Sequence, residues 1–167
     1  MYKKLNRDVG KPMKCYFAEN PERIIYTCMS KTVVLIDDDP DDLDMMKETL
    51  EKVQPTTHCI SFLYPDEAIR VITDELVVLP DIIIIDMNMP RKTGYECLVD
   101  LRRHEEFSDI PIIIYSTSIS PELRNTLLKA GATHVFQKPV KYDGWIQVVQ
   151  KVMNRDWSFF LLIGLGR

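Results

Sequence analysis

The chain has 167 residues, which is enough for one domain of ordinary size with extensions at its ends. Hydrophobic residues make up 46% of the chain, which supports a packed core and argues against a disordered protein. The formal net charge is −4 and no run of Lys or Arg stands out, which argues against direct binding to nucleic acid.

The sequence gives no sign of a membrane or secreted location. No apolar stretch approaches the ~20 residues of a membrane span, and the polar N-terminus lacks the apolar segment of a secretory signal. The four cysteines are scattered, with neither a CxxC pair nor a Cys/His metal spacing, so we expect reduced thiols. Together these features predict a cytoplasmic protein.

From residue 32 onward, short apolar runs alternate with segments of helical periodicity. Strands are predicted at 32–36, 59–64, 82–85, 112–115 and 134–137. The segments between and after them predict helices at 40–53, 65–76, 94–103, 121–130 and 145–152. The run of isoleucines at 82–85 has no polar alternation, which is typical of a parallel strand buried on both faces.

This alternation predicts an α/β domain over residues 31–153, with a parallel sheet covered by helices on both faces. Residues 1–30 are predicted to be an N-terminal extension, and Met29 offers an alternative start within them. Residues 154–167 form an apolar C-terminal tail. Its segment 157–163 is too short to span a bilayer and too apolar for a solvated end. Packing on the domain, a dimer or partner contact, and sequence foreign to the natural protein remain open for it.

Polar side chains follow the predicted strands at the point where each strand ends. Asp37 and Asp38 follow the first strand, and Asp86 follows the isoleucine run. Because the carboxyl ends of neighbouring parallel strands line one crevice, these acids are expected to converge. Two unit charges 4 Å apart repel by roughly 4 kcal/mol at an effective dielectric near 20. A hard divalent cation such as Mg²⁺, which prefers oxygen ligands, would relieve that repulsion.

A hydroxyl group and a lysine follow two further strands at the same predicted edge. Ser116 and Thr117 end the fourth strand, and Lys138 follows the fifth. Carboxylates that hold Mg²⁺, one acid as nucleophile, a hydroxyl and a cation together suit phosphoryl transfer through an aspartyl phosphate. Such a reaction needs little beyond positioning and charge stabilisation.

At these positions the chain resembles the receiver domain of bacterial two-component response regulators. The motifs that carry the resemblance lie at 34–39, 80–90, 93–96, 116–117 and 137–139, and it covers residues 31–153. Ser116 lies 30 residues and Lys138 lies 52 residues after Asp86, and both spacings match the family pattern. The resemblance implies a flavodoxin-like, doubly wound sheet of five parallel strands in the order 2-1-3-4-5, with helices on both faces.

The resemblance also implies a role for each motif residue. Asp86 would be the phosphoacceptor for a histidine kinase or a histidine phosphotransfer protein. Mg²⁺ would be held by Asp38 directly, by Asp37 mainly through water, and by Asp86 and the backbone carbonyl of Asn88. Ser116 would donate its hydroxyl to the phosphoryl group, beside the backbone amide of Thr117. Lys138 would pair first with Asp86 and then with the phosphoryl oxygens, and the Lys138–Pro139 bond resembles the family's cis peptide.

Two features depart from the family pattern. The position three before Lys138 is usually an aromatic switch residue, but here it is Val135, followed by Phe136. In addition, the residues after Met153 are too few for a DNA-binding module. A stand-alone receiver is therefore expected to signal by phosphorylation-dependent protein binding or phosphorelay and not to act as an enzyme, and both a monomer and a dimer remain open.

Two other functions compete with this interpretation. An aspartyl-phosphate phosphatase of the haloacid-dehalogenase type uses a similar acid, hydroxyl and lysine set. That class places a second Asp two residues after its nucleophile, where this chain has Asn88, and no cap domain is evident. A scaffold that ignores phosphate would not need all five of the residues Asp37, Asp38, Asp86, Ser116 and Lys138.

Overall fold

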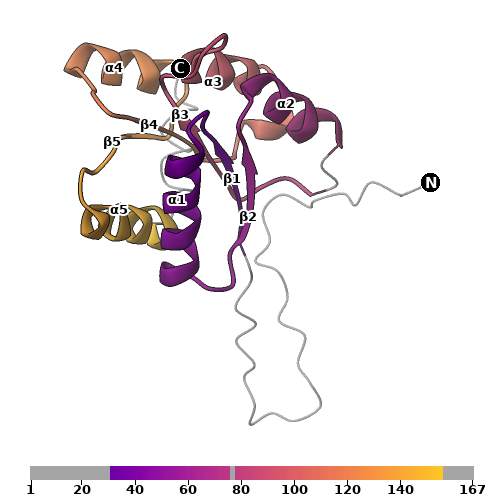
Figure 1. The fold of residues 1–167 in the computed structure, drawn as a ribbon. Helices are drawn as coiled ribbons and strands as arrows, with labels where there is room; N and C mark the ends of the chain where they lie inside the picture. The colour runs from indigo at the N-terminus through magenta and orange to yellow at the C-terminus, as the bar shows by residue number, and fades with distance from the viewer. Residues whose placement is uncertain (1–30, 76–77, 156–167) are drawn as a thin grey trace, which may run out of the picture.

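The computed structural model describes residues 31–75 and 78–155, which contain a five-stranded parallel sheet (Figure 1). Its strands are β1 (Thr32–Ile36), β2 (His58–Phe62), β3 (Ile82–Asp86), β4 (Ile112–Ser116) and β5 (His134–Gln137). They pair in the order β2-β1-β3-β4-β5, each pair parallel. The predicted flavodoxin-like fold with strand order 2-1-3-4-5 is therefore confirmed.

In the described ranges, five α-helices connect or follow the strands: α1 (Pro40–Val53), α2 (Pro65–Arg70), α3 (Gly94–Arg102), α4 (Pro121–Lys129) and α5 (Tyr142–Asn154). Local sequence explains several of their starts. The Asp39 side chain accepts a hydrogen bond from the Asp41 backbone at the start of α1, and Ser120 caps α4 in the same way. Thr93 and Glu96 form a reciprocal capping box at α3.

The helices cover the sheet on both faces, as Figure 1 shows with α1 and α5 on one side and α2, α3 and α4 on the other. Alternate residues of each strand supply the two cores. On β4, Ile114 packs on the side of α2, α3 and α4, while Tyr115 packs on the side of α1 and α5. All five residues of β3 are buried, as expected for a central strand covered on both faces.

The structure differs from the sequence-based expectations in several places. The second strand, predicted at 59–64, is His58–Phe62, and the last helix, predicted at 145–152, is Tyr142–Asn154. The helix predicted to run from residue 65 to 76 ends as an α-helix at Arg70 and continues as a π-helical turn, Val71–Glu75. The Lys138–Pro139 bond, which the resemblance made cis, is trans, as the intrinsic preference of an X–Pro bond favours. A short 3₁₀ turn, Glu105–Phe107, also follows α3.

The two ends of the chain lie outside the described residues. The N-terminal extension at 1–30 and the apolar segment at 157–163 therefore stay predictions. Among the helices of the described ranges, none has the length and apolar character needed to cross a bilayer.

Candidate functional site

The predicted acids converge at the carboxyl end of the sheet. β1 and β3 are hydrogen-bonded neighbours with Ile36 opposite Ile85, so the residues that follow these two positions lie side by side. Asp37, Asp38 and Asp86 each offer a carboxylate oxygen within 4.8 Å of the others. Asp37 and Asp86 are buried, whereas Asp38 is exposed. The carboxylates predicted to hold a metal are thus brought together, with Asp38 as the one open to solvent.

Lys138 lies at the centre of this cluster and contacts three carboxylates. Its Nζ is 2.9 Å from Asp37 Oδ2, 2.7 Å from Asp86 Oδ1 and 2.6 Å from Asp42 Oδ2. Burial alone would lower the pKa of Lys138, but its hydrogen bonds to Asp42, Asp86 and Asp37 outweigh that effect and raise the pKa. The lysine therefore carries its charge at neutral pH. Below, the acid site means the five residues Asp37, Asp38, Asp42, Asp86 and Lys138.

Asp37 is held in place from several directions. Its Oδ1 accepts a hydrogen bond of 2.9 Å from the backbone of Asp39, and its Oδ2 accepts one from the hydroxyl of Tyr115 as well as the contact from Lys138. Tyr115 is fully buried, and its ring lies under the Lys138 ammonium, with Nζ 4.6 Å from the ring centroid. Burial, together with the charge of Asp37, raises the pKa of the Tyr115 hydroxyl, so the tyrosine remains a proton donor.

The environment of Asp86 suits a reactive carboxylate. Burial raises its pKa, the charge of Asp37 adds to that effect, and the hydrogen bonds from Lys138 and the Asn88 backbone oppose it. The backbone N–H of Asn88 donates to Asp86 Oδ2 at 2.5 Å. The start of α3 also approaches closely: a Cβ on Gly94 would lie 2.2 Å from the Asp86 carbonyl oxygen, so only glycine fits there.

The hydroxyl residues lie on the neighbouring strand. Ser116, at the end of β4, is buried, and its Oγ accepts a hydrogen bond of 2.9 Å from the Asn88 side chain. Asn88 therefore bridges Asp86 and Ser116, through its backbone to one and its side chain to the other. Thr117 is exposed, and its backbone carbonyl accepts a hydrogen bond from the Gln137 side chain at 2.9 Å.

Two residues of this arrangement were not predicted from the sequence. Asp42 lies in the first turn of α1, within a stretch rich in acids where no spacing singles it out. Tyr115 was predicted only as a strand residue, although it directly precedes the predicted Ser116. Tyr115 also stacks on Phe136, with ring centroids 5.6 Å apart, and meets Trp145 edge-on at 6.1 Å.

The donor set fits a hard divalent cation. Four carboxylates face one ammonium, which leaves an excess of negative charge, and all the side-chain ligands are oxygens. Asp38, exposed beside the buried Asp37 and Asp86, provides access from solvent. When bound, Mg²⁺ would neutralise charge on the carboxylates and on a phosphoryl group.

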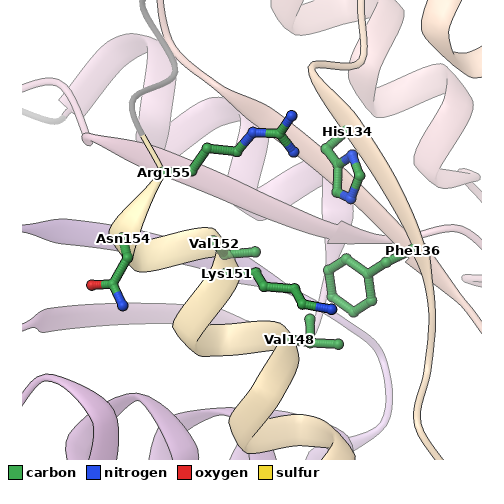
Figure 2. A pocket seen from close by; sticks show the side chains of 7 residues that line it. All are labelled: His134, Phe136, Val148, Lys151, Val152, Asn154 and Arg155. Atoms are coloured by element: carbon green, nitrogen blue, oxygen red, sulfur yellow. The ribbon is translucent and has the colours of Figure 1, made fainter.

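A separate pocket of about 590 Å³ lies between β5 and the C-terminal half of α5 (Figure 2). Its described lining consists of apolar and basic or amide side chains: His134, Phe136, Val148, Lys151, Val152, Asn154 and Arg155. None of these is a carboxylate or a hydroxyl residue. None of the predicted site residues is among these seven.

Comparison with known proteins identifies the family. A family model described as the response regulator receiver domain matches residues 33–150. The chain therefore belongs to the response regulator receiver domain family.

Individual relatives are more distant. The chain is 29% identical, over 71% of its length, to the probable C4-dicarboxylate response regulator DctR of Bacillus subtilis, and 30% identical over 73% to hybrid signal transduction histidine kinase D of Dictyostelium discoideum. It spans only 50% and 7% of the lengths of those two proteins. Among solved structures, the chemotaxis response regulator CheY4 of Vibrio cholerae superposes with a TM-score of 0.64 and 26% identity, covering 74% of this chain and 98% of that one.

Proposed function

We propose that the protein is a phosphorylation-switched receiver whose phosphoacceptor is Asp86. The single observation that carries this proposal is the pairing of Asp86 with Lys138 at 2.7 Å inside a cluster of carboxylates suited to Mg²⁺. The phosphoryl donor would be a histidine kinase or a histidine phosphotransfer protein in the cytoplasm. Membership of the receiver family supports this choice of donor.

The proposed reaction exchanges one bond to phosphorus for another. A carboxylate oxygen of Asp86 attacks the phosphorus atom and forms a new P–O bond, while the bond between phosphorus and the donor's histidine nitrogen breaks. The electron pair of the broken bond stays on that nitrogen, so no oxidant or reductant is needed. Asp86 attacks as the carboxylate anion, the form that its contact with Lys138 at 2.7 Å favours.

The roles of the surrounding residues follow from their positions. Lys138 would exchange its contact with Asp86 for one with a phosphoryl oxygen and so neutralise part of the added charge. Ser116 would donate its hydroxyl to a second oxygen, with the backbone amide of Thr117 beside it. Mg²⁺ would be held by Asp38, by Asp86 and the Asn88 carbonyl, and by Asp37 mainly through water. Lys138 already contacts Asp37, which agrees with an indirect role for that acid.

The output would be a change in protein binding. Phosphorylation adds charge and acceptor oxygens at Asp86. Ser116 would be drawn toward them, away from its present hydrogen bond with Asn88. The loop after β4, α4 and β5 would follow, so that a partner protein or a phosphorelay protein meets a different surface.

This coupling predicts the behaviour of Ser116→Ala. The variant should still be phosphorylated, because Asp86 and Lys138 are intact, but the chemical-shift changes over α4 and β5 on phosphorylation should be reduced. Two-dimensional NMR spectra of both proteins with and without acetyl phosphate would measure this. Equal responses in both proteins would contradict the coupling.

The first experiment on the function is phosphorylation by acetyl phosphate, with and without Mg²⁺, followed on a phosphate-affinity gel. A mobility shift that needs both Mg²⁺ and Asp86, and is lost in Asp86→Asn, is the expected result. Steady release of inorganic phosphate from many donors would favour a phosphatase instead. Neither a shift nor turnover would favour a scaffold that ignores phosphate.

A further inference from the structure

The lysine of the acid site has one more carboxylate partner than phosphoryl transfer at Asp86 requires. An ammonium group has three N–H donors, and three carboxylates surround Lys138 at 2.6–2.9 Å. On the remaining side the Tyr115 ring lies beneath the ammonium. All three donors are therefore engaged before any phosphoryl group arrives.

The three carboxylates differ in what happens to them when Asp86 is phosphorylated. Asp86 itself becomes the acyl phosphate, so the N–H group of Lys138 that now donates to Asp86 would donate to the phosphoryl group instead. Asp37 is buried and fixed by Asp39 and Tyr115. Asp42 makes the shortest of the three contacts, from a side chain that is 31% exposed on the first turn of α1. Asp42 is thus the partner that competes with a second phosphoryl oxygen for the ammonium.

We propose that Asp42 is a positioning residue that holds Lys138 in the unphosphorylated state and thereby limits how readily a phosphoryl group is accepted at Asp86. This inference rests on the proposed function. Asp42 acts through Lys138: it fixes the position of the ammonium group and offsets its charge. In the resting site its carboxylate offsets the ammonium charge, and that offset must be overcome when the ammonium turns toward phosphate.

Asp42→Asn tests the inference, because asparagine keeps the shape of the side chain but removes its charge. The initial rate of Asp86 phosphorylation by acetyl phosphate at saturating Mg²⁺ is expected to rise about two- to fivefold, the range for one partly exposed ion pair. Beryllofluoride, used as a phosphoryl analogue, should bind more tightly by a similar factor. Its binding can be followed by Trp145 fluorescence in a Trp157→Phe background, since the chain has two tryptophans.

Asp41→Asn is the matched control. Asp41 lies beside Asp42 in the same first turn of α1 and carries the same charge, and its side chain is exposed. Asp41→Asn lowers the negative charge that repels an anionic phosphoryl donor by the same amount as Asp42→Asn. It also changes the start of α1 in a comparable way. The difference between the two variants therefore isolates the contact with Lys138.

A double-mutant cycle with Lys138→Gln separates positioning from general charge effects. If Asp42 acts through Lys138, Asp42→Asn should change the rate in the parent protein and leave it unchanged in the Lys138→Gln background. Equal rates for Asp42→Asn and Asp41→Asn, a slower rate for Asp42→Asn, or an effect that persists without Lys138 would each overturn the inference. An unmodified parent protein would overturn the proposed function, and this inference with it. A modified parent with an unaltered Asp42→Asn would overturn the inference alone.

Discussion

The two faces of the sheet present different side chains next to the acid site. On the face covered by α2, α3 and α4, the last strands contribute Ile114 and Val135, and Ser116 approaches Asn88. On the face covered by α1 and α5, Tyr115 stacks on Phe136 and hydrogen-bonds to Asp37. The first face reaches the site through the hydroxyl group of Ser116. The second reaches it through a buried aromatic residue that is fixed by packing.

The aromatic residue that the family pattern places at position 135 is replaced here by Val135, and Phe136 follows it. Val135 faces α4, where the family pattern places an aromatic side chain. The aromatic residue of this chain stands one position later, at Phe136, and strand alternation turns it to the opposite face. Aromatic contact with the acid site is therefore made from the face of α1 and α5, through Tyr115.

The largest difference in stability between the two faces is expected from truncating Tyr115. Tyr115→Ala should lower the free energy of unfolding by about 3–5 kcal/mol, because it empties a large buried site and removes a donor from the buried Asp37. Val135→Ala, a smaller truncation on the other face, should cost about 1–3 kcal/mol. Urea denaturation followed by circular dichroism would measure both. Equal losses would contradict the larger contribution to stability expected of Tyr115.

Much of this arrangement could be predicted from the sequence, because strand ends and motif spacing are local signals. The apolar run at 82–85 and the acids after β1 and β3 were enough to predict that Asp37, Asp38 and Asp86 converge. The starts of α1, α2, α3 and α4 followed from a Pro or Gly residue, whereas α5 begins at Tyr142, three residues before the predicted start. These predictions needed only periodicity and the rule that parallel strands end at one edge.

The remaining contacts depend on how the elements pack together. Asp42 is one of several acids at the start of α1, and which of them faces Lys138 depends on the angle at which α1 leaves β1. The hydroxyl of Tyr115 reaches Asp37 because β4 and β1 lie on either side of β3, a relation that appears only in the folded sheet. The trans Lys138–Pro139 bond was missed because it was inferred from the family pattern alone.

A smaller effect is expected from removing the repulsion inside the acid site. Asp86→Asn should raise the free energy of unfolding at neutral pH by about 1 kcal/mol, since one of four clustered carboxylates loses its charge. The folded-state pKa of Asp86 is raised above its ordinary value of 3.8, mainly by burial, so folding disfavours its ionised form. The gain should be absent below that ordinary value, where the acid is neutral in both states, and should grow as pH rises through the folded-state pKa.

Asp44→Asn is the control for Asp86→Asn. Asp44 lies on α1 outside the acid site, and its side chain is 79% exposed. Its stability should follow the parent at every pH. Thermal unfolding of the three proteins across the acidic range would measure the difference. A stability gain in Asp86→Asn that did not depend on pH would argue against clustered charge as its cause.

The smallest expected effect concerns the far end of the face covered by α1 and α5. His134, at the start of β5, has its pKa lowered from the ordinary 6.5 by burial and by the charges of Arg155, Arg124 and Lys151. The folded state therefore resists protonation of this histidine. As pH falls below 6.5, the unfolded state takes up a proton first, so stability should decline until pH passes the folded-state pKa and then level off.

His134→Gln should remove this decline while leaving the stability at higher pH nearly unchanged. The difference between the two proteins, measured by urea denaturation from above neutral pH down to about pH 5, isolates the histidine from the carboxylates, which are common to both. A decline of equal size in both proteins would place its origin at other titratable groups and would contradict the role given to His134. The expected result would instead show that one face of the sheet carries two separate pH-sensitive ends. The end with carboxylates loses stability as pH rises, and the end with basic side chains loses it as pH falls.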